Sequence, residues 1–331
     1  NRANKAGMLE TTVDGGFSNM LVFNGARLGI SSDGIGTKIE LGERSRIYDT
    51  LGFDLVAMVV DDLIAGGFIP TNISNILDVD HLDYDTVDAL MRGLHDAANF
   101  ANISVTGGEI AELGNRIAGY GDEGMHFNWC STAIGILHPS LEKTIDGTAI
   151  QAGDIVMSIK SRGFRSNGFS AIRRVMQQNF GDNWHTQAYD DTQTWGQALL
   201  TPSLIFAPLL SKLLDEGFLI RGIAHITGGG IADNFRRILK ANNLGAKLDN
   251  LFLAHPIMEK LQTLGGISDE KAYLWWNMGN GMLFVLPQDS DVTAVSALAQ
   301  TLGYAVQKAG VVTNERSISL EQGKVNLTVN Y

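Results

Sequence analysis

An acidic residue followed by small residues and a lysine is the first group in this sequence that could do chemistry. Residues 32–38 read Ser-Asp-Gly-Ile-Gly-Thr-Lys and lie at the end of a predicted strand. Asp33 could hold Mg²⁺ and Lys38 could contact phosphate oxygens, because magnesium prefers one or two carboxylates together with substrate phosphates. The glycines would let the backbone approach such a ligand. The spacing is not that of a Walker A loop, and a plain polar turn is the alternative.

Three acids in the next predicted helix differ in their expected surroundings. The helix covers residues 53–66, and Asp62 falls at the border of its apolar face. An acid there would be partly buried and would need a partner, either a metal ion or a lysine such as Lys38. Asp54 and Asp61 lie opposite the apolar face, so we expect them to be exposed to solvent, Asp54 above all.

Two glutamates follow a glycine pair after the short strand predicted over residues 103–106. Glu109 and Glu112 are three residues apart and would share a face if this segment is helical. Together with Asp33 and Asp62, Glu109 could complete a site for Mg²⁺ and a nucleotide. The alternative is an ordinary helix start, since glutamate in a first turn is favoured by the helix dipole.

Two glycine-rich stretches, residues 166–168 and 227–230, open helices in the second half of the chain. The free N–H groups and the positive dipole end of a helix N-terminus bind anions. Arg165 precedes the first stretch and adds a planar fork of donors for phosphate. Ordinary helix caps are the alternative for either stretch alone. Two such starts in one domain favour a phosphorylated ligand.

Strand and helix patterns alternate along the chain, which predicts a mixed α/β or α+β fold. The chain has 331 residues, more than a single core usually supports, so we expect two domains. Turn signals over residues 139–153 place the first domain at 1–142 and the second at 143–331. The elements that would position the site are strands over 27–32, 72–78, 103–106, 129–137, 155–159 and 282–286, helices over 53–66 and 84–101, helices after Gly168 and Gly230, and a flexible loop over 114–126.

Composition excludes several classes of protein. The net charge is -11 and the pI is near 5.0, which argues against nucleic-acid binding but still allows a small anionic ligand. Cys130 is the only cysteine, so no disulfide can form within the chain. There is no apolar run of 18 residues and no signal-peptide core over residues 1–10, so we expect a cytoplasmic protein with no membrane partner.

Taken together, these stretches resemble the aminoimidazole ribonucleotide synthetase (phosphoribosylformylglycinamidine cyclo-ligase) family. They occur in the order typical of that family and run over most of the chain. The matching stretches are Gly15-Gly16-Phe17, Asp33-Gly-Ile-Gly-Thr-Lys38, Gly52-Phe-Asp-Leu-Val-Ala-Met58 with Asp62-Leu63, Gly107-Gly-Glu-Ile-Ala-Glu112, Ser166-Asn-Gly-Phe-Ser170 and Ala224-His-Ile-Thr-Gly-Gly-Gly230.

The resemblance implies two α/β domains and a homodimer whose N-terminal sheets pair into a barrel, with ATP in a cleft. It implies that ATP phosphorylates the formyl oxygen of formylglycinamidine ribonucleotide and that a nitrogen then closes the imidazole ring, a step of de novo purine biosynthesis. The residues so implied are Asp33, Asp62 and Glu109 for Mg²⁺; Gly15, Gly16, Phe17, Asp33, Gly34, Thr37, Lys38, Gly107, Gly108 and Glu109 for ATP; Ser166, Asn167, Gly168, Thr227, Gly228, Gly229 and Gly230 for the substrate; and Asp33, Lys38, Asp62 and Arg165 for catalysis.

Two positions depart from the family pattern. Arg165 stands where the family usually has histidine, and a permanently charged guanidinium cannot transfer protons as histidine does. Asp61 stands where the family usually has asparagine. Two alternatives therefore stay open: another ATP-using enzyme of the same superfamily, or a nucleotide-binding paralogue without turnover.

Overall fold

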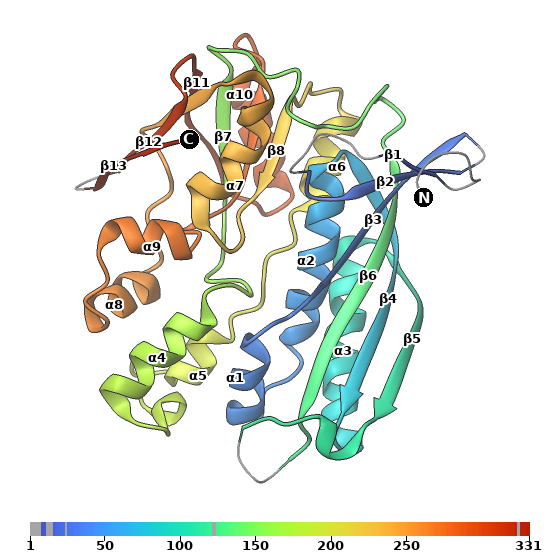
Figure 1. Ribbon diagram of the computed structural model, residues 1–331, viewed down its shortest axis with the longest axis vertical. Helices are drawn as coiled ribbons and strands as arrows, with labels where there is room; N and C mark the ends of the chain where they lie inside the picture. Colours follow the sequence, from blue (N-terminus) through green and yellow to red (C-terminus); the bar gives the residue numbers. More distant parts are fainter. Residues whose placement is uncertain (1–7, 11–15, 24, 121–123, 323–324) are drawn as a thin grey trace.

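The computed structural model places one β-sheet in each half of the chain (Figure 1). It describes residues 8–10, 16–23, 25–120, 124–322 and 325–331. The first sheet has the strand order β1-β2-β3-β6-β4-β5, and all its pairs are antiparallel except β4 with β5. Its half of the chain contains β1 Met8–Glu10, β2 Asn19–Phe23, β3 Ala26–Gly34, α1 Lys38–Ser45, α2 Leu51–Ala65, β4 Phe68–Val79, α3 Tyr84–Ala101, β5 Ser104–Glu112 and β6 Phe127–Leu137.

The second sheet has the order β13-β12-β9-β11-β7-β10-β8, and only β12 and β9 run parallel. Every residue of β10 is buried, because this strand lies inside the sheet and is covered on both faces. The elements of this half are β7 Ile155–Lys160, α4 Phe169–Phe180, α5 Trp195–Leu199, α6 Ala207–Asp215, β8 Gly222–His225, α7 Gly230–Leu239, β9 Gly245–Leu248, α8 Pro256–Leu264, α9 Asp269–Trp275, β10 Asn280–Leu286, α10 Val292–Thr301, β11 Val306–Thr313, β12 Ser317–Gln322 and β13 Val325–Asn330.

The first sheet has two unlike faces. Helices α2 and α3 run along one face, and in Figure 1 no described helix covers the other. Residues of β4 and β6 alternate accordingly, with Ile73 and Ala133 buried under the helices. Ile76 and Ile136 point to the open face and are 47% and 44% exposed. We call this helix-free side the open face.

The mixed α/β class predicted from the sequence is confirmed, and the helices predicted over 53–66 and 84–101 are α2 and α3. Two local predictions are wrong. The strand predicted to end at residue 32 continues through Asp33 and Gly34 in β3, and Lys38 begins α1, so only three residues connect the two elements. Residues 107–112 continue β5 as a strand and are not helical, since they pair along their length with β4. No helix among the described residues has the length and hydrophobicity needed to cross a bilayer.

Helix α2 is buried on all sides. It packs on the first sheet through β3, β4 and β6, and its other side contacts β8 and α6 of the second half. Asp54 and Asp61 are therefore 0% exposed, which corrects the expectation that they face solvent. The helical period identified the apolar side correctly, but it gave no sign that a second domain covers the polar side.

Lys38 pairs with Asp54 inside this domain interface. Its Nζ lies 2.7 Å from Asp54 Oδ2 and donates to the carbonyl of Thr201 at 2.9 Å, and neither charged side chain reaches solvent. The hydroxyl of Ser203 donates to the same carboxylate. Burial lowers the pKa of Lys38, and Asp54 offsets part of that effect. The ion pair thus joins α1 and α2 to the segment that precedes α6.

We predict that Asp54→Asn lowers the free energy of unfolding by about 3–5 kcal/mol, because it leaves the Lys38 ammonium buried without a counter-charge. The double variant Lys38→Met/Asp54→Leu removes both charges and should recover most of that loss. Urea unfolding followed by circular dichroism measures both. Equal stability of Asp54→Asn and the wild type would contradict the assignment of a buried ion pair.

Candidate active site

Asp61 ties α2 to the second half of the chain. One of its carboxylate oxygens accepts the backbone N–H groups of Phe206 and Ala207, at 2.8 and 2.9 Å, where α6 begins. The other oxygen lies 2.7 Å from Arg165 Nη2. A carboxylate suits this position because the first N–H groups of a helix have no partner within the helix.

Arg165 lies 1% exposed beneath the site, with its guanidinium 4.4 Å from the centre of the Phe206 ring. Its backbone is left-handed, with φ of 61°, a conformation that residues other than glycine adopt rarely. Its Nε and Nη1 groups are buried with no hydrogen-bond partner among the described residues. The two departures from the family pattern, Asp61 and Arg165, therefore contact each other.

Asp62 and His225 form a second pair across the domains. His225 is the last residue of β8, and its Nδ1 lies 2.7 Å from Asp62 Oδ1. Burial raises the pKa of Asp62 to about 7, against the attraction of Arg237 and Arg165, and burial lowers the pKa of His225 to about 3. His225 is therefore neutral at physiological pH. Its Nε2 has no partner among the described residues.

Asp33 lies at the mouth of this group. Partial burial raises the pKa of its carboxyl. The hydrogen bond from the Gly34 N–H opposes that rise, and repulsion from Asp62 adds to it. The structure thus brings Asp33 and Asp62 together, as the sequence predicted. Nowhere in the described part of the chain do three acidic, histidine or cysteine side chains gather closely enough to hold a metal ion unaided. Two carboxylates together with substrate phosphates still fit the ligand set that Mg²⁺ prefers.

Glu109 does not join Asp33 and Asp62 within one chain. It lies in the edge strand β5, separated from β3 by β6 and β4, a distance of roughly 14 Å at ordinary strand spacing. It pairs with Ile76, so alternation places it on the open face, whereas Asp33 pairs with Ser131 on the helix-covered face. The predicted convergence of three acids is wrong for a single chain, because it assumed a strand end at residue 106. Gly107 and Gly108 lie in β5 too.

Lys38 was predicted to contact phosphate, and its position argues against that role. Its ammonium group is enclosed and is already bound by Asp54 and Thr201, so it cannot reach the mouth of the site. Thr37 and Gly34 lie beside it at the ends of α1 and β3. The sequence pattern placed a lysine after the acid but could not show which way its side chain turns.

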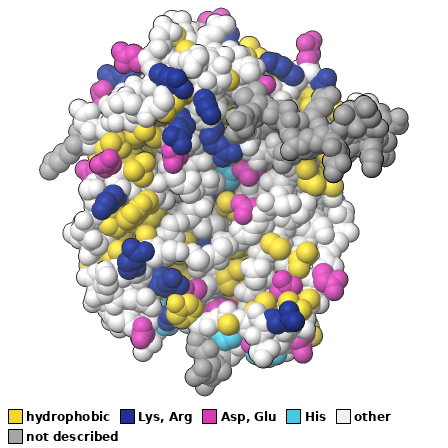
Figure 2. Space-filling view, viewed as in Figure 1, with side chains coloured by type: hydrophobic (Ala, Val, Ile, Leu, Met, Phe, Trp, Pro, Cys, Tyr) yellow, Lys and Arg dark blue, Asp and Glu magenta, His cyan; other side chains and the backbone are white. Residues whose placement is uncertain are grey.

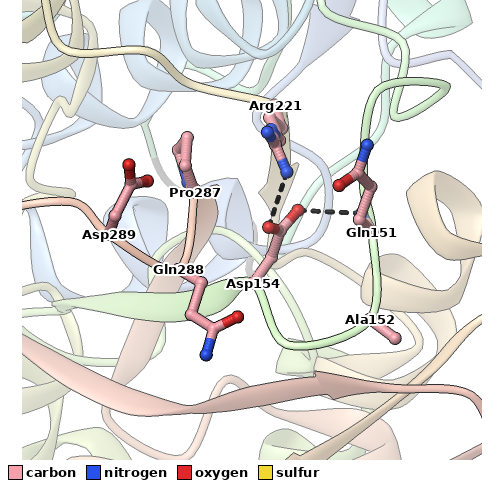
Figure 3. A pocket seen from close by; sticks show the side chains of 7 residues that line it. All are labelled: Gln151, Ala152, Asp154, Arg221, Pro287, Gln288 and Asp289. Carbon is pink, nitrogen blue, oxygen red and sulfur yellow. Dashed lines mark hydrogen bonds and ion pairs between the residues drawn. The ribbon is translucent and has the colours of Figure 1, made fainter.

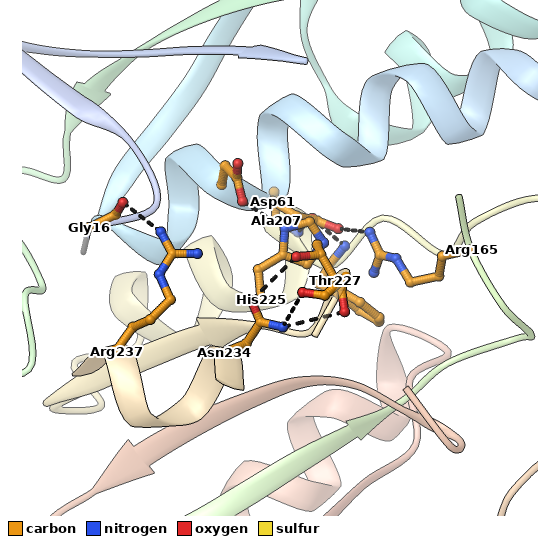
Figure 4. Close-up of polar contacts among 11 residues, drawn as sticks. Gly16, Asp61, Arg165, Ala207, His225, Thr227, Asn234 and Arg237 are labelled. Carbon is orange, nitrogen blue, oxygen red and sulfur yellow. Dashed lines mark hydrogen bonds and ion pairs between the residues drawn. The ribbon is translucent and has the colours of Figure 1, made fainter. Parts of the chain in front are cut away.

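The two glycine-rich helix starts both lie at this junction. Gly168 and Gly229 precede α4 and α7 with φ of 80° and 93°, a left-handed backbone that favours glycine. Asn234 fixes the second start by donating to the carbonyls of Thr227, Gly228 and Gly230 (Figure 4).

Buried hydrogen-bonding groups without partners collect next to these starts. They belong to Arg165, Ser166, Asn167, His225 and Trp276. Buried polar groups are nearly always bonded, so such a set indicates a polar ligand or ordered water.

Sequence reasoning missed two residues of this site. His225 was quoted within a matching stretch but was not given a role, although its place directly before a glycine loop was the available signal. Arg237 on α7 was missed altogether. Its Nη2 donates to the carbonyl of Gly16 at 2.9 Å and its guanidinium lies 3.9 Å from the Phe17 ring centre, so it joins the N-terminal segment to the site. Gly15 lies outside the described residues.

A separate hollow of about 480 Å³ lies at the other end of β8, away from His225 (Figure 3). Arg221 and Asp154 meet there at 2.7 Å, and Asp154 also accepts the N–H of Gln151. These polar groups satisfy one another, and no predicted site residue lines the hollow. The predicted acids Asp33 and Asp62 lie instead at the junction with His225.

Comparison with known families covers both halves of the chain. The family described as AIR synthase related protein matches with its N-terminal domain at residues 18–137 and its C-terminal domain at residues 151–322. A phosphoribosylformylglycinamidine cyclo-ligase of Sorangium cellulosum is 33% identical over 310 residues, 91% of this chain and 85% of that protein. One from Methanocaldococcus jannaschii is 30% identical over 92% of this chain and 83% of that protein.

Solved structures share the fold at low sequence identity. AaThiL complexed with AMPPCP and TMP superposes with a TM-score of 0.64 at 14% identity, over 96% of this chain and 92% of that one. A chain of the HypE–HypF complex gives 0.65 at 16% identity, over 94% and 92%. T. maritima PurL complexed with ADP gives 0.60 at 14% identity, over 97% of this chain and 46% of that one. At such identities the likeness supports the fold alone.

We predict that Asp61 and Arg165 are energetically coupled. Asp61→Asn leaves a buried guanidinium without its counter-charge and should cost about 3–5 kcal/mol of unfolding free energy. Arg165→His should also destabilise, whereas the double variant should cost at least about 1 kcal/mol less than the sum of the two single changes. Urea unfolding of the four proteins measures this. Additive effects would show that the observed 2.7 Å contact carries no coupling.

Proposed function

The chain belongs to the AIR synthase related family, and we propose that it is a phosphoribosylformylglycinamidine cyclo-ligase, which uses ATP to close the imidazole ring of aminoimidazole ribonucleotide. The observation that carries the proposal is identity of 30–33% with cyclo-ligases across both domains. The site supports it, since Asp33 and Asp62 lie near His225, which precedes one of the two glycine-rich helix starts, and buried polar groups without described partners lie beside both starts.

ATP activates a carbonyl oxygen in this reaction. Transfer of the γ-phosphoryl group to the formyl oxygen releases ADP, the substrate nitrogen attacks the activated carbon, and that oxygen leaves as phosphate. Catalysis of such a transfer consists mainly of positioning and charge stabilisation. Asp33 and Asp62 would hold Mg²⁺, which would neutralise developing phosphate charge. Their shared desolvation, which raises the pKa of both carboxyls, would be relieved by a bound cation.

The buried donors suit the substrate side of the site. Ser166, Asn167 and the backbone of residues 227–230 would bind the ribonucleotide, as the resemblance implies. Arg165 cannot accept a proton. His225 is neutral and its Nδ1 is oriented by Asp62, so its Nε2 can form a hydrogen bond with the substrate. With Asp62 ionised, Nδ1–H donates to it and Nε2 carries the free lone pair.

We predict that the protein, supplied with ATP, Mg²⁺ and formylglycinamidine ribonucleotide, releases ADP and forms the imidazole in equal amounts. Asp33→Asn should weaken Mg–nucleotide binding at least about tenfold, equivalent to about 1.4 kcal/mol, since it removes a charged ligand. Coupled ADP detection and absorbance of the ring measure turnover, and calorimetry measures binding. Asp289→Asn, in the distant hollow, is the control for an equal loss of charge.

Each alternative function has its own outcome in this assay. ADP release that does not depend on the ribonucleotide favours another ATP-using enzyme of the superfamily. Nucleotide binding with no turnover favours a paralogue that has lost activity. Unchanged Mg–nucleotide affinity in Asp33→Asn would contradict the metal assignment. Glu109→Gln is a separate arm, and a large loss of Mg–nucleotide binding there would mean that Glu109 of a second chain completes the site.

The open face supports a homodimer in which two first sheets pair. It presents Ile76 and Ile136 to solvent, and β5 leaves an edge without a described partner strand. Exposed apolar sheet surfaces and edges are normally covered in native proteins.

We predict that Ile76→Lys converts a dimer into monomers, because a charge would have to be buried between the sheets. Leu219→Lys, at another exposed apolar side chain in the second half, should leave the dimer intact. Sedimentation velocity measures both variants. A wild-type protein that sediments as a monomer at micromolar concentration would contradict the dimer.

A further inference from the structure

The indole of Trp276 lies against the start of α4. Trp276 directly follows α9 and is 1% exposed. A Cβ at Gly168, the residue before α4, would lie 2.5 Å from the indole Nε1, so a side chain there would displace the ring. Nε1 is buried and has no hydrogen-bond partner among the described residues. Because an indole nitrogen only donates, this N–H calls for an acceptor from a ligand or from water.

The turn after Trp276 holds the indole in place. Asn277 is buried, and its Nδ2 donates to the carbonyl of Gly163 at 2.9 Å. Its Oδ1 accepts a hydrogen bond from the hydroxyl of Ser161, also at 2.9 Å. Both partners belong to the loop that leads to α4. The Phe164 ring of that loop meets the Trp276 ring edge-on, with ring centres 5.1 Å apart. The indole and the loop before α4 are therefore fixed relative to each other.

The last turn of α9 also contacts the other glycine-rich start. A Cβ on Gly230, where α7 begins, would lie 1.9 Å from the carbonyl oxygen of Tyr273, so only glycine fits there. The two starts approach each other as well, since a Cβ on Gly228 would lie 3.7 Å from Oδ1 of Asn167. One end of α9 thus lies against both starts, and the indole N–H of Trp276 belongs to the α4 side.

The groups without partners at the start of α4 are suited to an anion. The first backbone bond of the helix is donated by Ala171, so the N–H groups of Phe169 and Ser170 have no partner within the helix. Ser166 Oγ and Asn167 Nδ2 are buried without described partners. Each of these groups can donate a hydrogen bond, as the indole does. A helix start with such donors favours a phosphate, which presents several acceptor oxygens.

We propose that the indole N–H of Trp276 donates to a phosphate oxygen of the ribonucleotide at the start of α4. This deepens the proposed function and rests on it, and it adds a binding residue from the end of α9 to the substrate side. Asn167 and Gly168 are partly exposed, so this start is open to a ligand from solvent. A nucleotide phosphate offers the same kind of oxygen, and the experiment separates the two sources.

The experiment compares Trp276→Phe with Trp184→Phe. Phenylalanine keeps an aromatic ring but removes the indole donor. Trp184 is the matched control, because its Nε1 is also buried without a described partner, and it lies beside Glu40 and Arg173 rather than beside Gly168. Calorimetry measures the Kd of ribose 5-phosphate, of formylglycinamidine ribonucleotide and of ADP with Mg²⁺, all without turnover. Thermal unfolding reports whether each variant is folded.

We expect Trp276→Phe to bind ribose 5-phosphate and the ribonucleotide about tenfold more weakly, because a hydrogen bond to a charged acceptor is lost. Its affinity for ADP with Mg²⁺ should stay within about twofold of the wild type, as should all affinities of Trp184→Phe. A loss of affinity for ADP alone would place a nucleotide phosphate at the indole and would contradict the assignment to the ribonucleotide.

A measurement on the wild-type protein does not depend on the stability of a variant. Two-dimensional NMR of isotope-labelled protein resolves the indole N–H signals, and the signal that Trp276→Phe lacks belongs to Trp276. We expect ribose 5-phosphate to move this signal downfield and to slow its exchange with solvent, as a hydrogen bond to an anionic oxygen does. The signal of Trp184 should stay where it is.

Three results would overturn the proposal. A Trp276 signal that ignores bound ribose 5-phosphate would mean that water alone satisfies the indole. Failure of the wild-type protein to bind ribose 5-phosphate would remove the phosphate site. Equal losses of affinity in Trp276→Phe and Trp184→Phe would reveal loosened packing. None of these measurements needs turnover, so a Trp276-dependent affinity in a protein that forms no imidazole would reject the proposed function and leave the phosphate contact standing.

Discussion

Burial of helix α2 on all sides is the constraint on which the junction depends. A helix between a sheet and a second domain has no solvated side, so each of its carboxylates must find a partner within the protein. Asp54 pairs with Lys38 and accepts a hydrogen bond from Ser203. Asp61 pairs with Arg165 and accepts the first N–H groups of α6. Asp62 contacts His225. Most of these partners come from the second half of the chain. The same charges that would destabilise an isolated helix therefore fix how the two halves meet.

This arrangement explains why Arg165 and His225 are bound by carboxylates on one side, while other nitrogen atoms of both side chains have no described hydrogen-bond partner. The α2 carboxylates bond Arg165 and His225 on one edge, which orients both side chains before any ligand arrives. Their remaining nitrogen atoms, Nε and Nη1 of Arg165 and Nε2 of His225, have no described partner. Buried polar groups without partners are costly in a folded protein. That cost is offset when a ligand supplies acceptors for Arg165 and a donor for His225, and groups already fixed in place need little reorganisation during the reaction.

Much of the fold could be predicted from the sequence, because periodicity reports which side of an element is apolar. It located α2 and α3 closely, and the motif at residues 32–38 together with the place of Asp62 on its helix predicted correctly that Asp33 and Asp62 lie near each other. It failed where a residue's surroundings come from distant segments. Asp61 has the pattern of a surface residue, but the second domain covers it. Lys38 has the pattern of a phosphate ligand, but it is bound to Asp54. Glu109 lies on the open face because β5 continues past residue 106. Arg237 carried no local signal at all, since its contacts come from Gly16 and Phe17, more than two hundred positions away.

The contact between Asp61 and Arg165 also bears on the charge state of His225. An arginine introduced alone would bury an uncompensated charge, and an aspartate introduced alone would do the same with opposite sign, whereas together they keep the interior neutral. The fixed positive charge has an effect beyond its partner, because after burial it is the largest influence that lowers the pKa of His225. A cation beside a buried imidazole favours the neutral ring, whose unprotonated nitrogen accepts hydrogen bonds. Arg165 thus helps to keep His225 in the form that can accept a hydrogen bond from a ligand.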